Sequence, residues 1–113
     1  MILPKADDAI IPSDKFLDYA LDSIKSRGKS IAFREALGYT KDNASLLIEN
    51  IRVHLKDYPA ESKGNKGYGE TYAVLMKLTG VNGRTANVMT AWLDDSRTGM
   101  MRLTSAYIKK GKV

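Results

Sequence analysis

Four residues of this chain carry side chains suited to cleaving a phosphodiester bond: His54, Arg102, Thr104 and Tyr107. His54 is the single histidine, and because imidazole titrates near neutral pH it is the first candidate general base. Arg102 and Thr104 combine a guanidinium with a hydroxyl donor, a pair that can bind a phosphate group. Tyr107 adds a hydroxyl that can donate to a leaving oxygen. Together with Arg84, these four residues have the chemical types with which a ribonuclease can cleave RNA through a 2′-hydroxyl.

The positions of these four residues in the sequence do not decide whether their side chains come together in the fold. Residues 101–108 form the last predicted strand, in which neighbouring side chains alternate between the two faces. Arg102 and Thr104 then share one face, and Tyr107 lies on the other unless the strand twists or ends there. His54 falls at the border of the apolar stripe of a predicted helix, where a histidine more often caps a core or faces water. Thr and Tyr are also good strand formers, so a purely structural role is the alternative.

The charge of the chain is concentrated in its second half. Residues 62–113 carry nine Lys or Arg against three Asp or Glu, a net charge of +6. Residues 1–61 carry nine against ten, a net charge of −1, which together give the overall +5. A basic surface of this kind indicates an anionic partner, most simply nucleic acid, and the alternative is a solvated basic surface without a partner.

Five further residues are candidates for binding RNA: Lys63, Lys66, Lys77, Arg84 and Trp92. The two lysines of the glycine-rich stretch 60–69 could meet a phosphate together with backbone N–H groups. That stretch is not a nucleotide-binding loop, because it contains no Gly-Lys followed by Ser or Thr and no predicted strand precedes it. Trp92 could stack on a base, although a single Trp in a hydrophobic strand more often belongs to the core.

Composition excludes several classes of protein. The chain of 113 residues contains no cysteine and one histidine, which rules out disulfides, thiolate metal sites and His-rich metal sites. We therefore predict no metal and no cofactor. No apolar run approaches the roughly 20 residues of a membrane span, and the first 12 residues do not form a signal peptide, so we expect a cytoplasmic site of action and no membrane partner.

Hydrophobic periodicity predicts helices first and strands afterwards. A helix begins after the N-cap Ser13 and ends near Gly28, a second spans residues 30–37 and stops at Gly38, and a third runs from the N-cap Thr40 to Pro59. Ile10 and Ile11 are candidates for an edge strand. Residues 72–79, 85–93 and 101–108 have strand periodicity. The predicted fold is a single α+β domain over residues 1–113: a mainly helical layer over 1–59, a loop over 60–69, and over 70–110 an antiparallel meander of three or more strands packed on three helices.

The Asn82-Gly83 turn leaves two registers for the first hairpin. A two-residue loop pairs Leu75 with Thr90 and places Trp92 on the face of Lys77. A three-residue loop with Gly83 as a bulge shifts the parity, so that Trp92 joins Tyr72 and Val74, and we favour this register slightly because it collects more aromatic bulk on one face.

Four sequence segments resemble an uncharacterised bacterial domain family. They are FREALGY at 33–39, GYGETYAV at 67–74, LTGVNGRTANVMTAW at 78–92 and RLTSAY at 102–107. Members of that family occur alone or as C-terminal domains of phage-head and polymorphic-toxin chains. The resemblance covers nearly the whole chain and implies no activity by itself.

The architecture is also similar to the barnase/EndoU/colicin/RelE group of ribonuclease toxins. That similarity implies metal-independent RNA cleavage that leaves a 2′,3′-cyclic phosphate, and it maps Thr104 and Tyr107 to last-strand positions of the group. Many of those toxins have Tyr-Pro where this chain has Tyr107 followed by Ile108, and His54 has no secure counterpart.

Our functional expectation is a toxin-like, metal-independent ribonuclease that acts on cellular RNA and is neutralised by a small acidic antitoxin or immunity protein. The alternative is a non-catalytic RNA- or protein-binding module of a phage or toxin system. An immunity protein is a third possibility, which the net charge of +5 opposes because immunity partners of nucleases are usually acidic.

Overall fold

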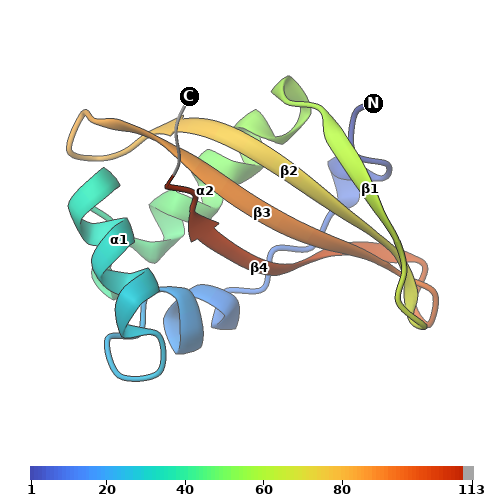
Figure 1. The fold of residues 1–113 in the computed structure, drawn as a ribbon, viewed down its shortest axis with the longest axis horizontal. Coiled ribbons are helices and arrows are strands. Elements are labelled where there is room, and N and C mark those ends of the chain that lie inside the picture. Colours follow the sequence, from blue (N-terminus) through green and yellow to red (C-terminus); the bar gives the residue numbers. More distant parts are fainter. Residues whose placement is uncertain (111–113) are drawn as a thin grey trace.

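A four-stranded antiparallel sheet runs through the molecule, with its strands in sequence order (Figure 1). The strands are β1 (Ala60–Asn65), β2 (Gly69–Thr79), β3 (Thr85–Asp95) and β4 (Met100–Ile108). Before them come a π-helical segment (Lys15–Ala20) and the α-helices α1 (Arg27–Leu37) and α2 (Ala44–His54), with 3-10 turns at Ala6–Asp8, Lys41–Asn43 and Leu55–Asp57. The computed structural model describes residues 1–110, except for the side chains of residues 18 and 19. The predicted α+β fold with N-terminal helices on an antiparallel meander is confirmed.

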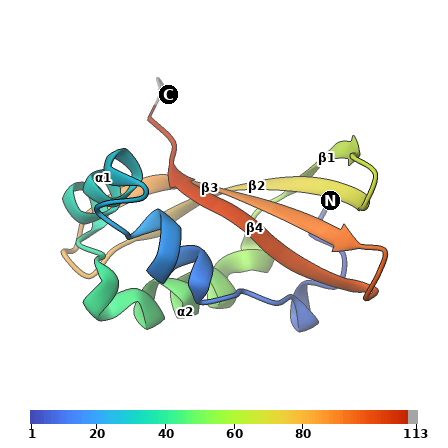
Figure 2. The same cartoon turned by 90° about the horizontal axis from the view of Figure 1, so that it is seen from below.

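The helices and the sheet form two layers around one core. Helix α2 lies against one face of the sheet, and α1 stands at the end of the sheet near the β2–β3 hairpin (Figure 2). The buried apolar side chains of both layers form one cluster, which includes Phe16, Phe33, Leu37, Leu47, Ile51, Val74, Met76, Val88, Trp92 and Leu103. In the part of the chain that the structure describes, no helix has the length and apolar character to cross a membrane.

Strand β1 lies where the sequence predicts a loop. It pairs with β2 from Ala60↔Val74 to Asn65↔Glu70, with an irregularity between Ser62 and Gly64. Of its six residues only Ala60 is buried, because β1 is the edge of the sheet and most of its side chains face solvent. A polar edge strand lacks the apolar alternation by which a strand is recognised in a sequence, so periodicity missed it.

The first predicted helix is mostly absent. The chain forms the short π-helical segment and then turns, and α1 begins at Arg27 with Gly28 inside its first turn. Asp22 explains this break, because its carboxylate accepts the backbone N–H groups of Ile24 and Lys25 at 2.8 and 2.9 Å and so stabilises a turn. Two other predicted helix boundaries are confirmed: Gly38 ends α1 with φ 82°, and Thr40 forms a capping box at the start of the third helical region. The second helix begins at Arg27 and not at residue 30, and α2 ends at His54, with a 3-10 turn before Pro59.

The β2–β3 hairpin has the three-residue loop. The backbone N–H of Gly80 donates to Arg84 O at 2.8 Å, which leaves residues 81–83 as the loop, and Gly83 has φ 81°. Trp92 therefore pairs with Tyr72 and lies on the face of Val74. The favoured register is confirmed, and it places Trp92 in the core.

Candidate nucleic-acid interface

One face of the sheet carries no helix over most of its length in the part of the chain that the structure describes (Figure 2). We call it the open face. Leu75 on β2 pairs with Met89 on β3, which pairs in turn with Tyr107 on β4, so these three side chains form a row across it. Leu75 is 42% exposed, although it lies in the middle of a strand. This uncovered row is therefore a candidate binding surface.

A β-bulge in β4 determines which predicted residues reach the open face. Ser105 pairs with Ala91 and Leu103 with Trp92, so Thr104 is an extra residue without a partner in the ladder. Arg102 pairs with Leu93 and Tyr107 with Met89, four residues apart on β3, so Arg102 and Tyr107 share one face. Simple alternation predicts that they lie on opposite faces, and that prediction is wrong because the bulge adds one residue between them.

Arg102 is held at the far end of the open face by a buried carboxylate. Its Nε lies 3.3 Å from Oδ2 of Asp95, whose side chain is 3% exposed and is also bound by Arg97. The pKa of Asp95 is lowered well below its usual range, first by the hydrogen bonds from the Arg97 side chain and backbone and further by Arg102. The partners of Arg102 and Tyr107 on β3 are four residues apart, so the two positions are separated by roughly 13 Å along the strand. The structure therefore orients Arg102 but does not bring it into contact with Tyr107.

Thr104 and Ser105 lie between these two residues on β4. The hydroxyl of Thr104 donates to the carbonyl of Ala91 at 3.1 Å, so its proton is already engaged. The hydroxyl of Ser105 makes no hydrogen bond within the described residues, and Ser105 is half-buried. The sequence did not indicate Ser105 as a candidate, because the bulge that places it on the face of Arg102 has no signal in the residue pattern.

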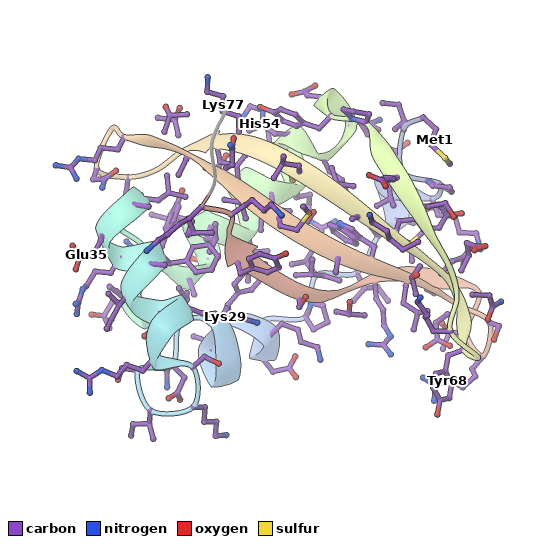
Figure 3. All side chains as sticks on the ribbon, in the orientation of Figure 1. Met1, Lys29, Glu35, His54, Tyr68 and Lys77 are labelled. Carbon is purple, nitrogen blue, oxygen red and sulfur yellow. The ribbon has the colours of Figure 1, made fainter. Side chains whose placement is uncertain are left out.

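His54 lies apart from the other three predicted catalytic residues. It is the last residue of α2, in the helix layer, and its Nδ1 is 3.0 Å from Oδ2 of Asp57. Its imidazole is 46% exposed. In Figure 3 it is labelled away from Lys29, whose ammonium lies over the Tyr107 ring of β4. The structure thus does not unite His54 with Arg102, Thr104 and Tyr107.

Tyr107 has a lysine neighbour that the sequence did not indicate. Nζ of Lys29, in the first turns of α1, lies 5.8 Å from the centre of the Tyr107 ring. This distance is within the range of a cation–π contact. The two residues meet only because α1 packs beside β4, and sequence periodicity does not report such a contact.

Two further lysines lie toward the same end of the open face as Tyr107, the end nearest the β2–β3 hairpin. Lys77 on β2 pairs with Asn87 on β3, and the backbone N–H of Lys109 donates to Asn87 O at 2.8 Å. Lys77 and Lys109 are both exposed. We call Lys29, Lys77, Asn87, Tyr107 and Lys109 the basic end. It joins three cations, an aromatic ring and an amide from α1 and three neighbouring strand segments, and none of the five is acidic.

The remaining predicted RNA-binding residues are distributed over the sheet. Lys63 forms an ion pair with Glu61 at 2.9 Å, and Lys66 lies exposed in the β1–β2 turn. Arg84 lies exposed in the β2–β3 hairpin, next to the basic end. Trp92 is 1% exposed, and its Nε1 donates to Thr90 Oγ1 at 2.8 Å. Its buried ring offers no face to a base, which agrees with the core interpretation of Trp92.

Metal ligands do not come together in the described part of the chain. No group of three His, Cys, Asp or Glu side chains there has the proximity to hold an ion. Besides the carboxylates of Glu61 and Asp95, which pair with Lys63, Arg97 and Arg102, the open face offers amines, hydroxyls and an aromatic ring, which bind anions and stack on planar groups.

The fold and this surface define a class: a small α+β protein whose antiparallel sheet presents one uncovered and partly basic face. The chain belongs to the family described as Domain of unknown function (DUF6883), whose model matches residues 2–110. The comparison with curated proteins and the comparison with solved structures found no match.

Proposed function

We propose that this protein binds RNA on the open face of its sheet, with the basic end as the main contact. The observation that supports this most directly is the contact of Lys29 with the Tyr107 ring at the same end of the sheet at which Lys77 and Lys109 flank Asn87. Lysines neutralise phosphates, and an aromatic ring on a sheet surface stacks on an unpaired base. The exposed Leu75 continues the row from Tyr107 and adds apolar surface for nucleobases.

We keep metal-independent ribonuclease activity as a second proposal. The bulge in β4 favours it, because it aligns Arg102, Ser105 and Tyr107 on one face, with Thr104 beside them. The guanidinium would bind a phosphate of the RNA chain, and near Tyr107 the 2′-oxygen would attack the scissile phosphorus while the bond to the 5′-oxygen breaks, giving a 2′,3′-cyclic phosphate. His54 is left out of this set. Lys29 and Tyr107 are then the groups available for proton transfer.

A small acidic antitoxin or immunity protein is proposed as the partner that covers the basic end.

Binding is tested by fluorescence anisotropy with a labelled single-stranded oligoribonucleotide over a range of salt concentrations. We expect affinity to fall as salt rises, and the Lys77→Met and Lys109→Met variants each to weaken binding and to reduce the slope of log K against log salt by about 0.7. Lys56→Met is the matched control, because it removes the same charge from the helix layer. An equal loss in the control, or no binding at low salt, contradicts the proposal.

Cleavage is tested on the same oligonucleotide in the presence of EDTA. Fragments that end in a 2′,3′-cyclic phosphate, and that disappear in a folded Arg102→Ala variant, would establish the ribonuclease. If the RNA stays intact at protein concentrations that saturate binding, the protein is a non-catalytic binding module.

A further inference from the structure

A small pocket lies at the β4 edge, beside the basic end. Its walls come from the π-helical segment, the start of α1 and the bulge of β4, and the lining residues are Lys15, Ala20, Ser26, Lys29, Thr104, Ser105 and Ala106. Among the residues that the structure describes, the lining includes two lysines and three residues with a hydroxyl group, and no carboxylate. The chemistry of the lining therefore favours an anion.

Two irregularities of the backbone form this pocket. The π-helical turn at Lys15–Ala20 replaces regular helix on one wall, and the bulge at Thr104 bends β4 on the other. Ala20 and Ala106 are each 3% exposed, and their small side chains leave the space between the walls unfilled. π-Turns and β-bulges are both over-represented at functional sites.

Several donors around the pocket have no protein acceptor. Within the described residues, the Lys29 ammonium makes no ion pair or hydrogen bond, and it contacts the Tyr107 ring. The hydroxyls of Ser26 and Ser105 also make no hydrogen bond there. Ser26 precedes the first turn of α1, so the positive end of the helix dipole adds to the charge of the lysines.

We propose that this pocket binds one phosphate group of the RNA, with Lys29 and Ser105 as its principal donors. This inference rests on the proposed RNA binding and names a subsite within it. The pocket volume of about 180 Å³ is below the roughly 300 Å³ at which small-molecule sites begin, so the pocket suits a phosphate and not a nucleoside. Lys29 lines the pocket and also lies over Tyr107, so the nucleotide attached to a bound phosphate extends toward that ring and the open face.

The first measurement is a titration of the full chain with inorganic phosphate, followed by NMR of the backbone amides. We expect saturable shifts centred on Ser26, Lys29 and Ser105. The Lys29→Met and Ser105→Ala variants should weaken phosphate binding by about tenfold, the loss of one charge-assisted hydrogen bond. The control Lys56→Met removes a charge from the helix layer and should bind phosphate like the original protein. Shifts elsewhere, no saturation, or equal losses in all three variants overturn the subsite.

The second measurement separates the sources of the phosphate. Oligoribonucleotides with a 5′-phosphate, a 3′-phosphate or hydroxyls at both ends are compared by anisotropy, with Lys29→Met and Ser105→Ala beside the original protein. A terminal phosphate that raises affinity only when both side chains are present identifies an end-binding subsite. Equal affinity for all three RNAs, reduced alike by the two variants, identifies an internal phosphodiester.

The two proposals fail in different ways. RNA binding that depends on Lys77 and Lys109 but not on Lys29 or Ser105 overturns the subsite and leaves the proposed function. Phosphate binding at Ser105 without any binding of RNA overturns RNA as the ligand of the subsite, and with it the proposed function.

Discussion

At the scale of single residues, Asp95 is the ionisable group most tightly held by its neighbours on the open face. Its carboxylate accepts the Arg97 backbone N–H at 2.9 Å, Nε and Nη2 of Arg97 at 3.0 Å each, and Nε of Arg102. Arg97 in turn lies 5.3 Å from the Tyr68 ring. Asp95 therefore stabilises the β3–β4 turn and orients the side chain of Arg102.

Acid should destabilise the protein through Asp95. Its pKa is lowered in the folded state, chiefly by Arg97, so the ionised form is stabilised by folding. This stability is fully present above the unfolded pKa of about 4 and is lost as pH falls toward the lower folded value. We expect the free energy of unfolding from urea titrations to decrease below pH about 4. The Asp95→Asn variant should show a smaller decrease, and an unchanged pH profile would contradict this role.

The buried Thr90 hydroxyl links the Trp92 ring to the backbone of β2. Thr90 Oγ1 accepts from Trp92 Nε1 and donates to Val74 O, each at 2.8 Å, and Thr90 is fully buried. The Thr90→Val substitution keeps the shape of the side chain but leaves the indole N–H of Trp92 without an acceptor. We expect a loss of about 1–3 kcal/mol in the free energy of unfolding, measured by urea titration of Trp fluorescence. A neutral Thr90→Val variant would show that the indole N–H finds another partner.

At the scale of elements, close backbone contacts hold the hairpins against their neighbours. The β3–β4 turn is attached to the β1–β2 turn, because the backbone N–H and the hydroxyl of Ser96 both donate to Tyr68 O at 2.9 Å. At the other end of the sheet, a Cβ at Gly80 would overlap the carbonyl of Leu37 at the end of α1. The β2–β3 hairpin and α1 thus pack together only because residue 80 has no side chain.

The Gly80→Ala substitution should therefore separate α1 from the hairpin. Its methyl group would collide with the Leu37 backbone, and we expect a loss of about 2 kcal/mol or more in the free energy of unfolding. Gly83→Ala is the matched control, since that Cβ would meet open space and only the left-handed φ of 81° costs about 1 kcal/mol. Urea titration of both variants makes the comparison, and a smaller loss at residue 80 than at residue 83 would be the contrary result.

At the scale of the whole molecule, the positive charge is concentrated in the sheet layer, and the activity of that layer can be tested in cells. The basic half of the chain forms the sheet, and the near-neutral half forms the helical cover. If the protein cleaves RNA, induced expression should arrest growth and produce discrete RNA fragments, and the folded Arg102→Ala variant should abolish both. Full toxicity of Arg102→Ala would remove Arg102 from the site. Normal growth and intact RNA at high expression would favour the binding module.

Most local features of this protein were determined by sequence, and the first predicted helix is the exception. Strands β2, β3 and β4, the three-residue loop with Gly83, the Gly38 stop and the Thr40 cap all follow from residues close together in the chain. Hydrophobic periodicity, positive φ and capping act over a few residues, so they can be read without a structure. The same local information placed Arg102, Thr104 and Tyr107 on one strand.

Only the tertiary structure decided how these parts form a surface. The polar strand β1 exists because β2 supplies its hydrogen-bond partners, and the bulge at Thr104 places Arg102 and Tyr107 on one face. The approach of Lys29 to Tyr107 and the separation of His54 from β4 both depend on how the helices pack. Such contacts join residues far apart in the chain, and their energy comes from packing and register, which no short window of sequence contains.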